Sequence, residues 1–107
     1  MQRLAIIALA FAGLGYAGAS LSATGMQVFQ KGKKFSERSV TIAVGDAIEF
    51  VNDDSNVHNV HSATEGFEFD LGAQNPGDSE SVTFDKAGEL KVRCAIHPRM
   101  RMTVTVE

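Results

Sequence analysis

Short hydrophobic runs of alternating polarity, separated by turn signals, fill the chain after residue 20 and constrain its fold more than any other feature. Residues 40–44 and 90–94 place apolar side chains at every second position. Gly and Asp residues at 45–46 and 75–78 mark turns between such runs. No convincing amphipathic helix interrupts the pattern. The sequence therefore predicts an all-β domain, either a sandwich or a barrel.

The first nineteen residues have the pattern of an export signal. Arg3 provides the positive start, residues 4–14 are largely apolar, and residues 17–19 are the small residues of a cleavage site. The apolar stretch is short for a bilayer span, and the run is broken by Gly13, Gly15 and Gly18. We predict a cleaved signal peptide over 1–19, with Ser20 as the new N-terminus, and a single domain over 20–107. A retained membrane anchor is the alternative.

The predicted mature domain has no disulfide to stabilise it. A domain of this size buries about 60–65% of its unfolded surface, and small exported domains often add disulfides. Here Cys94 is the only cysteine, so it needs another explanation, and metal ligation supplies one. Loss of Arg3 with the signal changes the formal charge from −3 to −4. This acidic balance excludes a nucleic-acid binder, and we expect a monomer without a membrane span.

A cluster of potential metal ligands precedes the last hydrophobic run. Cys94, His97 and Met100 follow one another at three-residue intervals, and His58 offers a second imidazole upstream. One thiolate, two imidazoles and a thioether are the ligands of an electron-transfer copper site. Zinc also accepts Cys and His but rarely a thioether, so the set favours one copper ion. His61 lies three residues from His58 and should face the other way, toward solvent.

The alternation predicts where the thiol lies. Leu90, Val92 and Cys94 share one face of a strand, whereas Lys91 and Arg93 share the other. The sulfur should therefore reach the core side at the strand's end, where an apolar shell would shield a bound metal.

With these motifs, the sequence resembles the cupredoxins, most closely those of the amicyanin type. The spacing Cys-x2-His-x2-Met, the Pro after the His, and His58-Asn59-Val60-His61 carry the resemblance. It implies a Greek-key β-sandwich that carries one electron on a copper ion bound by His58, Cys94, His97 and Met100. His97 would be the more exposed ligand and the route for electrons.

Some residues of the ligand loop depart from the family pattern. Ala95 lacks the hydroxyl that often fastens Asn59, and Ile96 replaces a common proline. Ile96 therefore has an amide N–H, which we expect to give the Cys94 sulfur a second hydrogen bond beside that of Asn59. Met102 competes with Met100 for the fourth ligand position, and the register of the last strand favours Met100.

The resulting functional hypothesis is an exported, periplasmic blue copper protein that carries single electrons and is not an enzyme. A filled four-ligand set leaves no open position for a substrate, and three His residues are too few for a multicopper enzyme. The resemblance implies a c-type cytochrome or a dehydrogenase as redox partner. The alternative is a periplasmic protein that delivers copper as cargo.

Overall fold

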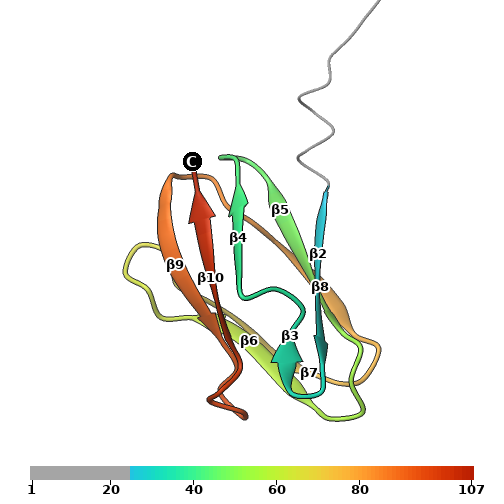
Figure 1. Cartoon of the computed structure of the whole chain (residues 1–107). Helices are drawn as coiled ribbons and strands as arrows, with labels where there is room; N and C mark the ends of the chain where they lie inside the picture. Colours follow the sequence, from blue (N-terminus) through green and yellow to red (C-terminus); the bar gives the residue numbers. More distant parts are fainter. Residues whose placement is uncertain (1–24) are drawn as a thin grey trace, which may run out of the picture.

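The computed structural model describes residues 25–107, which form two β-sheets packed face to face (Figure 1). The five-stranded sheet has the order β4-β10-β9-β6-β7, and the four-stranded sheet has the order β3-β2-β5-β8. The strands are β2 (Met26–Lys31), β3 (Lys34–Phe35), β4 (Ser39–Ile42), β5 (Ala47–Asn52), β6 (His58–Ser62), β7 (Phe69–Gln74), β8 (Ser79–Thr83), β9 (Gly88–Arg93) and β10 (Arg101–Val106). No helix occurs among these residues, which confirms the all-β prediction. The predicted signal peptide lies outside the described residues and stays a prediction.

The chain passes repeatedly between the two sheets, as a Greek-key sandwich requires. β4 pairs with β10 in parallel and β2 pairs with β5 in parallel, while the other neighbours run antiparallel. Five connections between the described strands change sheets: those from β3 to β4, β4 to β5, β5 to β6, β7 to β8 and β8 to β9. No helix of the described part is long and apolar enough to cross a membrane.

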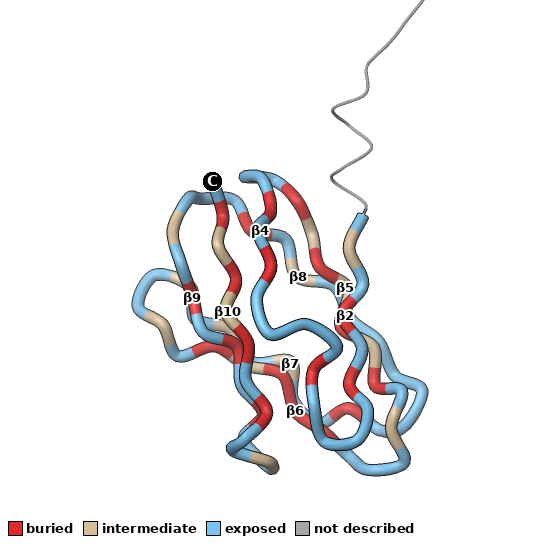
Figure 2. Tube along the Cα trace, viewed as in Figure 1, coloured by how far each residue is buried: buried red, intermediate tan, exposed pale blue. Residues whose placement is uncertain are grey.

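Buried residues alternate with less buried ones along strands of both sheets (Figure 2), and the buried hydrophobic side chains form one core. Leu90, Val92 and Cys94 are buried, whereas Lys91 and Arg93 are exposed, so the predicted inward face of β9 is confirmed. The expected alternation ends earlier than predicted in β4. Val44 is 50% exposed, because β4 stops at Ile42 and the turn that follows is closed by the Ala43 N–H donating to the Asp46 carboxylate.

The segments that carry the candidate ligands gather at one end of the sandwich, opposite the C-terminus (Figure 1). These are the start of β6, the loop between β9 and β10 and, beside them, the β2–β3 hairpin. The hairpin turns through Gly32 and Lys33, both with positive φ (63° and 59°). Two consecutive left-handed residues give the tight turn whose twist matches that of the flanking strands.

A buried polar cluster lies beneath the start of β6. The Gln30 amide donates to Gln74 Oε1 (2.7 Å), and the Asn52 amide donates to the Gln74 carbonyl (2.9 Å). Gln74 is the cross-strand partner of His58. The cluster therefore connects β2 and β5 of one sheet to the strand pair that begins at His58, and fixes that end of the sandwich.

Candidate metal centre

Three potential ligands from two parts of the chain converge at this end. His58 is the first residue of β6, Cys94 directly follows β9, and His97 lies in the β9–β10 loop. The Cys94 Sγ is 4.0 Å from His58 Nδ1 and 3.9 Å from His97 Nδ1, and the two Nδ1 atoms are 3.1 Å apart. His58 and Cys94 are buried and His97 is half-buried, which confirms that His97 is the more exposed histidine.

The triangle formed by these atoms fits a metal ion. A point equidistant from corners separated by 3.1, 3.9 and 4.0 Å lies about 2.1 Å from each of them. Metal–nitrogen bonds are about 2.0–2.1 Å and metal–thiolate bonds about 2.3 Å long, so an ion in or near the plane of the three atoms would contact all of them. One thiolate and two imidazoles in a trigonal arrangement are the donors expected around electron-transfer copper.

A carboxylate orients the buried histidine. His58 Nε2 lies 2.8 Å from Asp54 Oδ2, and the Asp54 side chain is only 9% exposed. With the Nε2 proton directed at this carboxylate, Nδ1 keeps its lone pair for a metal. The hydrogen bonds from His58 and from the Lys33 N–H hold the pKa of Asp54 well below its usual range. Asp54 therefore stays ionised, and it connects the β2–β3 hairpin to the candidate centre.

Sequence reasoning missed this role. Asp53, Asp54 and Ser55 lie between β5 and β6, directly before His58, and the sequence alone did not connect Asp54 with the imidazole. The available signal was the four-residue spacing from Asp54 to His58. That spacing indicates contact in a helix, whereas here a turn before a strand brings the two side chains together.

The Cys94 sulfur accepts a backbone hydrogen bond from the Asn59 N–H, at 3.3 Å. The second hydrogen bond expected from the Ile96 N–H is not found: among residues 25–107, this N–H does not donate to the sulfur. The neighbouring Ala95 N–H donates to Asn59 Oδ1 (3.1 Å), and the Ile96 side chain is 51% exposed. Ile96 therefore contributes to the exposed surface of the loop and not to the hydrogen bonding of the sulfur.

Asn59 is fastened without the hydroxyl that Ala95 lacks. Its Nδ2 donates to Asp70 Oδ1 (2.8 Å) and to the Gly72 carbonyl (3.1 Å), and its Oδ1 accepts from Ala95. A bulge makes this possible, because Leu71 and Gly72 of β7 stand opposite the single residue Val60. The side chain of Asn59 therefore joins the ligand loop to β7.

Two further residues have roles that the sequence did not reveal. Asp70 lies in a polar segment, and its carboxylate accepts hydrogen bonds from the Asn59 amide and the Gly72 N–H (2.8 Å). These bonds, the Gly72 bond above all, lower the pKa of Asp70. His61 was expected to face solvent, yet it is half-buried, with Nδ1 3.0 Å from Asn59 Oδ1. Both residues support Asn59, and His61 is outside the three-residue group of potential ligands.

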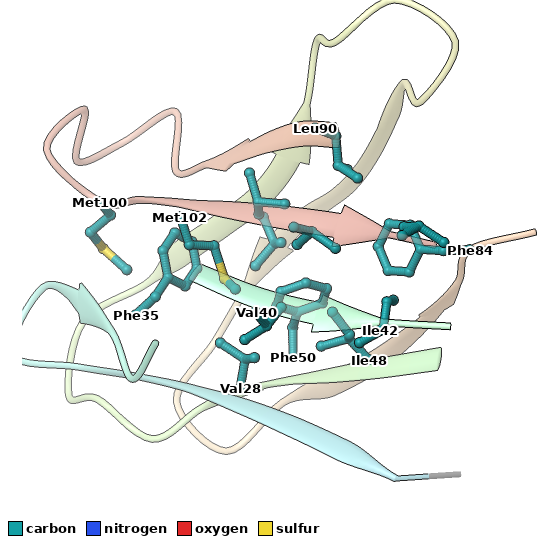
Figure 3. Close-up of a cluster of buried hydrophobic side chains, with 14 of the residues drawn as sticks. Val28, Phe35, Val40, Ile42, Ile48, Phe50, Phe84, Leu90, Met100 and Met102 are labelled. Atoms are coloured by element: carbon teal, nitrogen blue, oxygen red, sulfur yellow. The ribbon is translucent and has the colours of Figure 1, made fainter. Parts of the chain in front are cut away.

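The loop that carries His97 is closed by its own backbone. The Cys94 N–H donates to the Met100 carbonyl (3.1 Å), and the Met100 N–H donates to the His97 carbonyl (2.9 Å). Both candidate methionines are buried, but they lie differently (Figure 3). Met102 is opposite Val92 within β10 and belongs to the inward face with Val104, whereas Met100 ends the loop.

Comparison with known proteins identifies the family. Residues 23–107 match the copper binding proteins of the plastocyanin/azurin family. The chain belongs to this family. A relative in Methylorubrum extorquens, the methylamine utilization protein MauL, is 33% identical over 107 residues, covering 99% of this chain and 93% of that protein.

Solved structures place the chain among the amicyanin-like cupredoxins. An amicyanin variant in its Cu(I) form superposes with a TM-score of 0.73 at 26% identity, over 77% of this chain and 81% of that one. A purple cupredoxin from Nitrosopumilus maritimus gives 0.69 at 27% identity, over 78% and 100%. The copper-containing nitrite reductase of Thermus scotoductus gives 0.72 at 27% identity, but this cupredoxin spans only 22% of that enzyme. His58, Cys94 and His97 thus form a potential copper site in a copper-binding family.

Proposed function

We propose that this cupredoxin is an exported type 1 copper protein that carries one electron at a time between redox partners. The observation that carries the proposal is the triangle of His58, Cys94 and His97 ligand atoms, at separations that suit a trigonal metal site. Bound copper supplies a centre that changes charge by one between Cu(II) and Cu(I). The protein's part is to hold the three donors in place and to keep water from the buried side.

We propose Met100 as the fourth, weak ligand. It is buried at the end of the loop whose backbone closes on Cys94, next to the other donors in the chain. Met102 is committed to the core face of β10, opposite Val92. With four protein donors, no position stays open for a substrate, which supports a carrier and not an enzyme.

The partner and location are part of the same proposal. The relative MauL is named for methylamine utilization, and another similar protein is amicyanin. Together with the predicted signal over 1–19, this supports a periplasmic carrier that takes electrons from a dehydrogenase or passes them to a c-type cytochrome. The half-buried edge of His97 is the proposed route for the electron, because the other imidazole and the thiol are buried.

An absorption spectrum of the copper-loaded, oxidised protein tests the proposal. We expect an intense visible thiolate-to-copper charge-transfer band that disappears on reduction and is missing from Cys94→Ser. Ser62→Ala is a matched control, because it removes a hydroxyl elsewhere on β6 and should keep the band. A colourless oxidised protein that still holds one copper per chain would contradict the proposal.

Delivery of copper as cargo is distinguished by kinetics. A carrier should cycle repeatedly between its two redox states at an electrode and release copper slowly to a chelator. The buried, hydrogen-bonded ligands favour this behaviour. Rapid transfer of copper to a chelator without reversible redox cycling would support delivery instead.

A further inference from the structure

The cationic residues of this acidic protein are unevenly placed. Three adjoining surface depressions lie at and beside the His97 end, and seven of the nine Lys and Arg residues of 25–107 line them. No Asp or Glu lines any of the three. We call this the basic surface: Lys33, Lys34, Arg38, Lys91, Arg93, Arg99 and Arg101.

The depressions are continuous with the candidate electron route. One groove contains His97 together with Ile96, Pro98 and Arg99 of the loop and Lys33 of the facing hairpin. A second groove shares Lys34, Pro98 and Arg99 with the first and continues to Arg38 and Arg101. The half-exposed Ile96 adds apolar area to the groove that contains His97, and Lys33, Lys34 and Arg99 line the same groove. Apolar area bordered by charged residues is typical of a surface that contacts another protein.

The charges of the basic surface are poorly compensated within the protein. Arg93 and Arg101 stand directly opposite each other in the β9–β10 register, an arrangement that destabilises a sheet when the charges are alike. Among the described residues, Lys91 is the one member of the basic surface in an ion pair, with Glu89. Arg93 and Arg101 are exposed and lie on the outer face of β9 and β10, so a partner can reach them.

We propose that the basic surface docks a redox protein with an acidic surface, and orients it with its electron-transfer group over the edge of His97. This inference rests on the proposed carrier function and adds the charge of the partner. Opposite charges would steer the encounter and raise the association rate, and the net negative charge elsewhere would orient the protein before contact. Because exposed charges are screened by salt, the preference should weaken as ionic strength rises.

Stopped-flow electron transfer to two cytochromes tests the inference. The Cu(I) protein is mixed with an acidic c-type cytochrome and, separately, with a basic mitochondrial cytochrome c. We expect the rate constant for the acidic partner to be the larger at low ionic strength and to fall as salt is added. Arg99→Glu should lower this rate constant by about fivefold at low salt. The substitution changes the charge by two units at the contact surface and so weakens the attraction that steers the acidic cytochrome.

Lys86→Glu is the matched control, because it makes the same change in net charge outside the basic surface. An equal loss in both variants would show that only net charge matters and would overturn the proposal, as would a preference for the basic cytochrome. Nuclear magnetic resonance titration of the metal-free protein with the acidic cytochrome provides a readout independent of copper. Shifts should centre on Arg99 and Lys33, and shifts centred elsewhere would contradict the docking site.

The two proposals fail in different ways. If the carrier function is wrong, the copper protein alone, without a partner protein, will not cycle reversibly at an electrode. If only the docking surface is wrong, the electrode response stays normal while the acidic cytochrome gains no advantage. Binding to vesicles of anionic lipid that depends on Arg99, without binding to the acidic cytochrome, would assign the surface to a membrane and overturn a protein partner.

Discussion

Asn59→Ala should reduce the stability of the metal-free protein substantially. The Asn59 side chain is buried, and it donates to the Gly72 carbonyl and accepts from the Ala95 N–H. Each of these hydrogen bonds contributes about 1 kcal/mol to the free energy of unfolding, and the space left by the amide adds a smaller amount. We count nothing for the contacts with Asp70 and His61, because Asp70 is exposed and His61 is half-buried, so water can replace the Asn59 side chain there. The expected loss is about 2–3 kcal/mol.

Thermal unfolding followed by far-ultraviolet circular dichroism measures this loss. In a domain of this size, 1 kcal/mol shifts Tm by about 4–8 °C, so Tm should fall by about 8–24 °C. Circular dichroism suits the chain because it has no Trp and its one Tyr lies within the predicted signal. Asn56→Ala is the control, since Asn56 is exposed and its backbone carbonyl, which accepts from Asn52, is retained.

The copper-loaded variant provides a second measurement. The Asn59 N–H that donates to the Cys94 sulfur belongs to the backbone and survives the substitution. The charge-transfer band should therefore stay near its wild-type energy while Tm falls. A fall in Tm of less than about 3 °C, or one equal to that of Asn56→Ala, would refute the role of the Asn59 side chain as the tie between the ligand loop and β7.

Three further predictions concern the ligands and their supports. Met100→Leu should shift the reduction potential and the visible spectrum, whereas Met102→Leu should change neither and cost less than about 1.5 kcal/mol of stability; the reverse pattern would make Met102 the ligand. Asp54→Asn should raise the reduction potential in voltammetry, because it removes a negative charge that favours Cu(II) at His58; an unchanged potential would contradict this. Asp70 has a folded-state pKa below its unfolded value of 3.8, so its ionised form stabilises the fold above about pH 4 and this contribution is lost as pH falls further. Asp70→Asn should therefore show a shallower loss of stability between about pH 4 and pH 2 in urea unfolding, and an unaltered slope would exclude the effect.

The strands and the potential ligands were predictable because their signals are local. A strand with one face in the core must alternate, so β9 and β10 could be predicted from their side chains alone. β3 was missed because two residues, Lys34–Phe35, are too few to show a period. Cys94 and His97 lie in one short loop, where a thiolate and an imidazole indicate a metal site. Such a site needs a second imidazole, which His58 offers.

The supports of the site were not predictable because they depend on tertiary contacts. Asp54 and Asp70 are acidic residues in polar segments, and nothing in their neighbours separates them from solvated acids. Their roles follow from a turn that directs Asp54 at His58 and from a bulge that directs Asp70 at Asn59. The Ile96 expectation failed for a related reason: a free N–H shows that a donor exists, but the path of the loop decides what it can reach.

These supports explain how a small domain without a disulfide can keep the potential ligand atoms of a metal site in fixed positions. Asp54 fixes one imidazole, the Asn59 N–H fixes the sulfur, and the bond from Cys94 to the Met100 carbonyl closes the loop that carries the second imidazole. Each contact joins residues of the protein itself, so the packed sandwich and these hydrogen bonds position the three donor atoms. A domain that folds only around its metal must instead use metal-binding energy to order the chain. Donors positioned in this way should move little when bound copper gains or loses an electron. A rigid site of this kind suits electron transfer better than release of the metal as cargo.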